Sequence, residues 1–157
     1  MARKTRRDML QASCLFMLQP LAACGKTRNN MENETVLDVV LYSFINRPII
    51  DIYLNGTDIG VAGPLGGTSV ITEVKIPFGA QRLSWRLDGP EGTPGNGEQL
   101  SIKNKLVVNS DQIPKGTFYM GVYLYPDYTA ELTFSKFIPG NSKRGEAIFD
   151  ELKNGKR

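Results

Sequence analysis

The segment that decides the fold class runs from Thr117 to Tyr125 and reads TFYMGVYLY. Its side chains alternate between two faces: Phe118, Met120, Val122 and Leu124 on one, and Tyr119, Tyr123 and Tyr125 on the other. This two-residue period predicts a β-strand. Pro126-Asp127 then breaks the pattern, and residues 130–134 are predicted to return as the partner strand of a hairpin.

Extended segments with turn signals between them continue outward from this hairpin over residues 36–134. They include residues 82–87, with Leu83, Trp85 and Leu87 on one face, and residues 100–108. Asn55-Gly56 is the strongest short hairpin signal among them. About seven or eight short strands predict an all-β domain, either an antiparallel β-sandwich or a small barrel. A helical spacing occurs only at residues 144–152, which predicts a short C-terminal helix appended to this domain.

Two glycine-rich segments interrupt the predicted strands, and we expect both to be loops. The first is the run Gly63, Pro64, Leu65, Gly66 and Gly67. The second, residues 88–97, holds four glycines and two prolines and is the longest irregular segment. Long loops without local apolar anchors are often functional, so both segments are candidate contact surfaces.

The first 23 residues have the pattern of a secretory signal peptide. A basic start at residues 3–7 precedes an apolar run at residues 9–21, which is shorter than the roughly 20 residues that span a bilayer. The ending Leu21-Ala22-Ala23-Cys24 resembles the bacterial lipobox, in which the cysteine is acylated and the signal is cut before it. The alternative is an ordinary secretory signal with an unrelated cysteine.

Acylation of Cys24 would anchor the chain stably, since several acyl chains hold a protein where one chain is marginal. The residue after Cys24 is Gly25 rather than aspartate, which by resemblance to known sorting signals favours an outer membrane lipoprotein that faces the periplasm. Residues 24–34 are then a flexible lipid-proximal tether, and residues 35–157 a single β domain.

Composition removes several classes of function. The chain has no histidine and two cysteines, so no Ser-His-Asp or Cys-His triad and no His-ligated metal site can form. The formal net charge is +3, but four basic residues and one acidic residue lie in residues 1–23, which leaves 15 of each sign. We therefore expect no nucleic-acid binding, and no cofactor or metal.

An enzyme is not expected either, because the carboxylates are scattered one per strand or turn rather than paired. They are Asp51, Asp58, Glu73, Asp88, Asp111, Asp127 and Glu131. The polar residues Asp88, Glu91, Asn96 and Glu98 do not have the spacing of an EF-hand. We interpret these four, together with residues 63–67, as candidate partner-binding residues. The tyrosines of residues 119–125 are a further candidate, if their face of the sheet is exposed.

Two segments carry a resemblance to a known family. One runs from Asn46 to Gly56, NRPIIDIYLNG, and is followed by the run at residues 63–67; the other runs from Tyr119 to Asp127 with its return strand to Phe134. They resemble a family of small proteobacterial lipoproteins of unknown function, often encoded beside type VI secretion spike proteins and phospholipase effectors. Members often have a cysteine pair after the glycine-rich loop, but residues 68–75 contain no cysteine here.

The resemblance implies an immunity protein, since several such neighbours neutralise the lipase in the periplasm. We therefore expect a protein, monomeric when free, that binds and inhibits a phospholipase effector near the membrane to which Cys24 holds it. The alternative is an envelope structural or assembly lipoprotein that binds another envelope partner. A well-formed apolar pocket would favour ligand binding instead.

Overall fold

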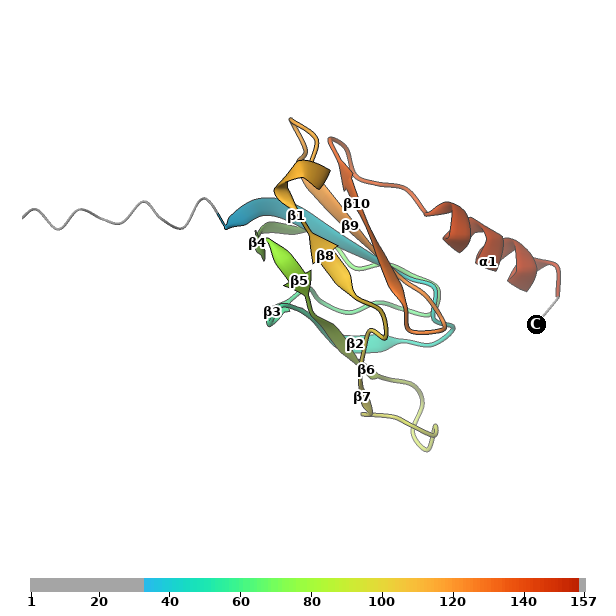
Figure 1. Cartoon of the computed structure of the whole chain (residues 1–157). Helices are drawn as coiled ribbons and strands as arrows, with labels where there is room; N and C mark the ends of the chain where they lie inside the picture. The colour runs from blue at the N-terminus through green and yellow to red at the C-terminus, as the bar shows by residue number, and fades with distance from the viewer. Residues whose placement is uncertain (1–32, 156–157) are drawn as a thin grey trace, which may run out of the picture.

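Ten strands and one α-helix make up residues 33–155, the part of the chain that this computed structural model describes (Figure 1). Sheet A has the order β10 (Ala130–Ser135), β9 (Tyr119–Leu124), β1 (Glu34–Ser43) and β4 (Ile71–Pro77). Sheet B has the order β3 (Thr57–Asp58), β2 (Ile49–Leu54), β6 (Leu83–Leu87) and β7 (Gln99–Ser101). A two-stranded sheet C pairs β5 (Gly79–Gln81) with β8 (Leu106–Val108), and a 3₁₀ turn follows at Ser110–Gln112.

The sheets stay open and stack as a sandwich rather than closing into a barrel, so the all-β prediction is confirmed and the sandwich is the form adopted. The inner face of sheet A supplies Val39, Leu41, Met120 and Val122 to the core. The inner face of sheet B supplies its other half, and the predicted face of β6 is confirmed, because Leu83, Trp85 and Leu87 are all buried.

One pair of strands departs from the antiparallel expectation. The predicted hairpin of β9 and β10 is antiparallel, as is the pair β1 and β4, but β1 and β9 run parallel from Asp38↔Tyr119 to Ser43↔Leu124. Parallel strands cannot be joined by a tight turn. The direction of this pair is therefore set by contacts between distant parts of the chain, which local sequence patterns do not report.

The alternation within β4 is shifted by a β-bulge. The sequence places Ile71 on the same face as Lys75, opposite Val74. In the structure the register slips opposite Asp38, Glu73 adopts a positive φ of 56°, and Ile71 packs against the same core as Val74. The extra residue of a bulge reverses the face of every residue on one side of it.

The sequence predicts one extended segment from Leu100 to Val108. The structure instead has two strands there, β7 and β8, which belong to different sheets. Asn104, between β7 and β8, explains the break. Its side-chain amide donates to the carbonyl of Ala130 at 2.8 Å and accepts from the Ala130 amide at 2.8 Å. An Asn side chain at the edge of β10 thus takes the place of a neighbouring strand.

The C-terminal helix α1 (Lys143–Lys153) covers part of the outer face of sheet A and builds a second core there. Phe44, Tyr123 and Tyr125 from the sheet are buried together with Ile148 of the helix. The helix is therefore packed on the sheet rather than a free appendage, and two of the tyrosines considered as exposed contact residues are buried beneath it. Within residues 33–155, no helix has the length and apolar character to cross a bilayer.

Candidate partner-binding site

The loop of residues 88–98, which joins β6 to β7, is organised by Arg47. The Arg47 side chain reaches this loop from the connection between β1 and β2. Its Nε donates to the Asp88 carbonyl at 3.0 Å, its Nη1 to the Pro94 carbonyl at 3.1 Å, and its Nη2 to Asn96 Oδ1 at 2.6 Å. One guanidinium therefore ties both ends of the loop to the same point.

Asn96 organises the loop from inside. While its Oδ1 accepts from Arg47, its Nδ2 donates to the carbonyls of Gly89 at 3.0 Å and Pro90 at 2.9 Å. Backbone bonds then close successive turns from Thr93 to Pro90, from Asn96 to Thr93 and from Glu98 to Gly95. The segment that the sequence presents as irregular is thus a hydrogen-bonded structure whose shape is fixed before any partner arrives.

The four polar residues predicted for this loop have different roles in the structure. Asp88 is half-buried, and its amide donates to the Pro48 carbonyl at 3.0 Å. Asn96 is an internal organiser of the loop. Glu91 and Glu98 are exposed, and neither side chain makes a hydrogen bond or ion pair with any residue between 33 and 155. These two carboxylates are the charged groups that the loop presents to solvent.

The glycine-rich segment 63–67, expected to be a loop, is held by backbone hydrogen bonds to neighbouring residues. The Leu65 amide donates to the Ile45 carbonyl at 2.9 Å, and the Gly66 carbonyl accepts from the Ser43 amide at 2.7 Å. Gly67 forms an isolated antiparallel bridge with Tyr42. The segment therefore extends the edge of sheet A beyond the start of β4, and Gly63, Pro64 and Gly67 are its exposed residues.

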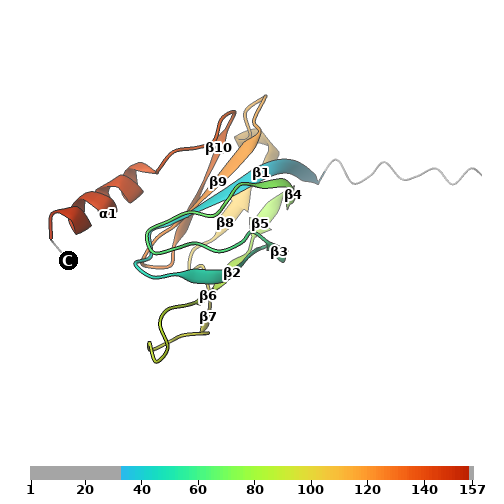
Figure 2. The same ribbon diagram turned by 180° about the vertical axis from the view of Figure 1, so that it is seen from behind.

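Both predicted segments lie beside the connection between β1 and β2. Residues 63–67 contact it at Ile45, and loop 88–98 contacts it at Arg47 and Pro48. Figures 1 and 2 place this end of the sandwich away from the start of β1. No hydrogen bond joins the two segments directly within the described chain, so they are neighbours on one end of the fold rather than a single joined site.

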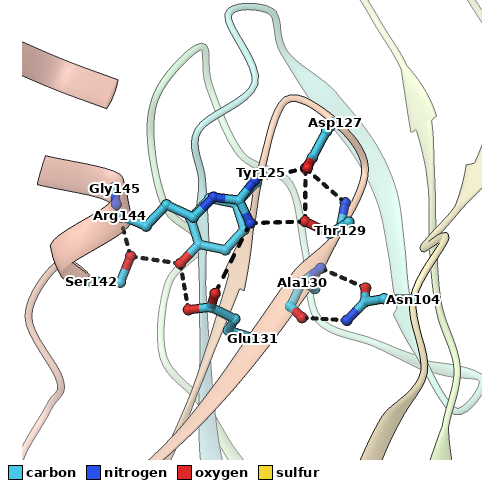
Figure 3. A network of polar contacts seen from close by, with 9 residues as sticks. All are labelled: Asn104, Tyr125, Asp127, Thr129, Ala130, Glu131, Ser142, Arg144 and Gly145. Carbon is cyan, nitrogen blue, oxygen red and sulfur yellow. Dashed lines mark hydrogen bonds and ion pairs between the residues drawn. The ribbon is translucent and has the colours of Figure 1, made fainter. Parts of the chain in front are cut away.

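A polar network that the sequence did not reveal fastens α1 to the β9–β10 hairpin (Figure 3). The Arg144 guanidinium lies 3.9 Å from the centre of the Tyr125 ring and donates to Asp127 Oδ2 at 2.8 Å. The Tyr125 hydroxyl donates to Glu131 Oε2 at 2.8 Å and lies 2.8 Å from the Ser142 hydroxyl. The only sequence signal was Ser142, a favourable N-cap residue before the helical pattern.

The ionisation of this network follows from its contacts. The hydrogen bond from the Thr129 hydroxyl, assisted by Arg144, lowers the pKa of Asp127 to about 2. Burial raises the pKa of Tyr125 to about 12. At neutral pH the network therefore pairs a fixed carboxylate with a fixed cation beside an un-ionised phenol, an arrangement suited to holding α1 in place rather than to transferring protons.

Close packing at the start of α1 completes this attachment. Ser142 Oγ accepts from the Gly145 amide at 2.9 Å as the N-cap. A Cβ atom at Gly145 would lie 2.0 Å from the Phe44 ring, so a glycine is what allows the helix to approach the sheet.

Two hollows flank β8, one of about 410 Å³ toward β6 and β7 and one of about 560 Å³ toward β10. The first is lined by Leu83, Ile102 and Leu106, but also by exposed Arg82 and Lys105. It opens to solvent and is not the enclosed apolar pocket that would favour a ligand-binding protein. No group of three or more acidic, cysteine or histidine side chains within residues 33–155 is placed to hold a metal ion.

The predicted lipid attachment at Cys24, the signal peptide of residues 1–23 and nearly all of the predicted tether lie outside the described residues. Their interpretation continues to rest on the sequence alone. Comparisons of the chain with protein-family models, with curated proteins and with solved structures found no match.

Proposed function

We propose that this chain is a lipid-anchored, periplasm-facing immunity protein that binds a type VI secreted phospholipase effector and blocks it through loop 88–98. The identity of the effector as a phospholipase comes from the resemblance of residues 46–67 and 119–134 described above. The alternative remains an envelope assembly lipoprotein, which would use the same kind of surface on a different partner.

The observation that carries the proposal is the fixed shape of loop 88–98. Three hydrogen bonds from Arg47 and two from the side-chain amide of Asn96 hold a segment that contributes no large side chain to the core. An inhibitor needs no catalytic group, only a complementary surface, and a loop ordered in advance loses less conformational entropy when it binds. This organisation supports a recognition role for the loop.

The charge and position of the loop support the same role. Glu91 and Glu98 are exposed and unpaired within the described chain, which favours a basic patch on the partner. The loop lies at the end of the sandwich away from the start of β1, the end nearest Cys24 in the sequence (Figure 1). A membrane anchor at Cys24 would therefore leave the loop facing away from the bilayer, where a partner can reach it.

The test is co-expression of the lipase-like gene adjacent to this one, directed to the periplasm, with and without the full chain. Immunity predicts that the chain rescues the cells and that effector and lipoprotein purify together in detergent. The double substitution Glu91→Lys and Glu98→Lys is expected to weaken the complex by about tenfold or more, because it replaces attraction by repulsion.

The matched control is Asp111→Lys, another exposed acidic residue, which lies on the 3₁₀ turn before β9. This control should leave both rescue and binding unchanged. Killing of cells that contain normal amounts of acylated chain would overturn the immunity proposal in favour of envelope assembly. Rescue that survives the double substitution would keep immunity but remove loop 88–98 as the contact.

Point substitutions are preferable to shortening the segment at residues 63–67. Its backbone bonds to Ser43 and Ile45 are part of the edge of sheet A, so a deletion there would disturb the fold as well as any contact.

A further inference from the structure

Exposed apolar side chains gather at one end of sheet A. Seven large hydrophobic residues of the described chain are exposed, and four of them belong to this end: Val36 (53%), Phe118 (58%), Phe137 (73%) and Ile138 (56%). Single exposed apolar residues are ordinary, but a group that includes two phenylalanines marks an interaction surface.

The strand register places the backbones of Val36, Phe118 and Phe137 at the same end of sheet A, and Ile138 follows Phe137 directly. The Asp38 amide donates to the Phe118 carbonyl at 2.9 Å, and the Phe118 amide donates to the Ser135 carbonyl at 3.0 Å. The starts of β1 and β9 and the end of β10 therefore meet at this end of the sheet. Figures 1 and 2 both show the loops before β9 and after β10 side by side there.

The chain enters the sandwich at this same end, because β1 begins at Glu34. Cys24 precedes the first described residue, Asn33, by nine positions. A chain of that length spans at most about 30 Å even when fully extended. A lipid on Cys24 would thus hold this end of sheet A, and not loop 88–98 or α1, within reach of the bilayer surface.

We propose that Val36, Phe118, Phe137 and Ile138 form a membrane-contact surface that inserts into the lipid interface beside the anchor. This inference rests on the proposed acylation of Cys24. Phenylalanine and aliphatic side chains of proteins that lie on a bilayer are buried at the boundary between headgroups and acyl chains. The ammonium of Lys136, which lies 5.9 Å from the centre of the Phe137 ring, can stay among the headgroups while its stem follows the apolar surface.

Apolar contact rather than charge carries the attraction. This end of the sheet carries the cations Lys75, Lys115 and Lys136 and the carboxylates Glu34 and Asp111, and Lys75 pairs with Glu34 at 3.8 Å, so the excess is one positive charge. The surface is therefore not strongly basic, and binding to vesicles should depend little on salt. For the same reason, the surface should bind neutral and anionic bilayers alike.

The experiment uses the full lipoprotein, purified from cell envelopes in detergent and reconstituted into vesicles of phosphatidylethanolamine and phosphatidylglycerol. Phe137→Trp places a fluorophore in the proposed surface, and Val61→Trp places one at a matched position that is 60% exposed but outside it. The native Trp85 is buried and contributes the same background to both, which the unsubstituted chain measures. Brominated acyl chains in the vesicles then report contact with lipid by quenching.

Membrane contact predicts a blue shift and strong loss of emission for Phe137→Trp, with Val61→Trp unaffected. Equal quenching of both, or of neither, overturns the proposal. A blue shift of Phe137→Trp that occurs only at high protein concentration in lipid-free detergent would assign the surface to contact with a second copy of the chain. That result would also overturn the proposal. Mass spectrometry of Cys24 reports acylation separately, so a missing anchor is distinguished from a surface that does not touch lipid.

Discussion

Replacing Arg47 by methionine should loosen loop 88–98 while leaving the sandwich intact. The substitution keeps the aliphatic stem and removes three hydrogen bonds, to Asp88, Pro94 and Asn96. A bond of this kind contributes about 0.5–1.5 kcal/mol net, and two of the three are solvent-exposed, which places their sum near the low end. We expect local opening of the loop to become easier by about 1–2 kcal/mol, or roughly 5–30-fold.

Hydrogen exchange measures this opening directly. The reporting amides are those of Thr93, Asn96 and Glu98, each of which donates to a carbonyl within the loop. Exchange of these three amides should accelerate by the same roughly 5–30-fold, whereas exchange of the Ile52 amide on β2, which donates to the Gly60 carbonyl, should be unchanged. An equal acceleration at Ile52 would mean that the whole fold, rather than the loop, had been weakened.

The matched control is Arg86→Met. Arg86 lies on β6 next to the loop and forms an ion pair with Asp51, but makes no bond to residues 88–98 in the described chain. It should leave the three loop amides unaffected. Unaltered exchange of those amides in Arg47→Met would refute the reasoning, since the loop would then be ordered by Asn96 and its backbone turns alone.

The attachment of α1 allows three further predictions. Gly145→Ala should lower the free energy of unfolding in urea by about 1–3 kcal/mol, because a methyl group would meet the Phe44 ring and lift Ile148 from its site, a strain that exceeds the gain of about 1 kcal/mol in helix propensity. A more stable variant would contradict the contact. The folded-state pKa of Asp127, lowered to about 2 from 3.8, means that its stabilisation is present above pH 4 and is lost as the pH falls toward 2. The melting temperature of Asp127→Asn should therefore depend less on pH over that range. The difference should be small, because the Asp127 side chain is exposed. The folded-state pKa of Tyr125, raised from 10.0 to about 12, means that its stabilisation is present below pH 10 and is lost as the pH rises from 10 to 12, so Tyr125→Phe should be less sensitive to alkali in melts followed by circular dichroism.

Local sequence patterns were sufficient where structure is local. The alternation of residues 117–125 and the Pro126-Asp127 break predicted the β9–β10 hairpin, and the spacing of Leu83, Trp85 and Leu87 predicted the buried face of β6. In both cases a period of two places apolar side chains on one face, and a turn signal follows within the same segment.

The same patterns failed where residues distant in the sequence determine which side chains are buried. The bulge at Glu73 shifts the alternation of β4. It arises from the pairing of β4 with β1, and the sequence of β4 alone does not report that pairing. The burial of Tyr123 and Tyr125 depends on α1, which follows them in the chain and can approach only because position 145 is a glycine. Neither effect has a signature in the segment that it alters.

For the candidate site, the sequence predicted a loop at residues 88–97, which matches loop 88–98 of the structure, but not the contacts that hold it. Glycine and proline content marks such a segment as irregular, yet composition does not distinguish a disordered loop from an ordered one. This loop is ordered because Arg47 binds it. Arg47 is 41 positions from Asp88, and the sequence around it does not distinguish it from any surface arginine. Asn96 was singled out as a contact residue, whereas its amide is used within the loop.

The parallel pairing of β1 and β9 has a consequence for how this protein folds. The first strand of the sandwich occupies an interior position in sheet A, between β9 and β4, so one side of it stays open until nearly the whole chain is available. Contacts between such distant segments slow folding, because a long loop must close before they form. Until then one edge of β1 keeps its backbone N–H and C=O groups unpaired, and such unpaired strand edges favour aggregation.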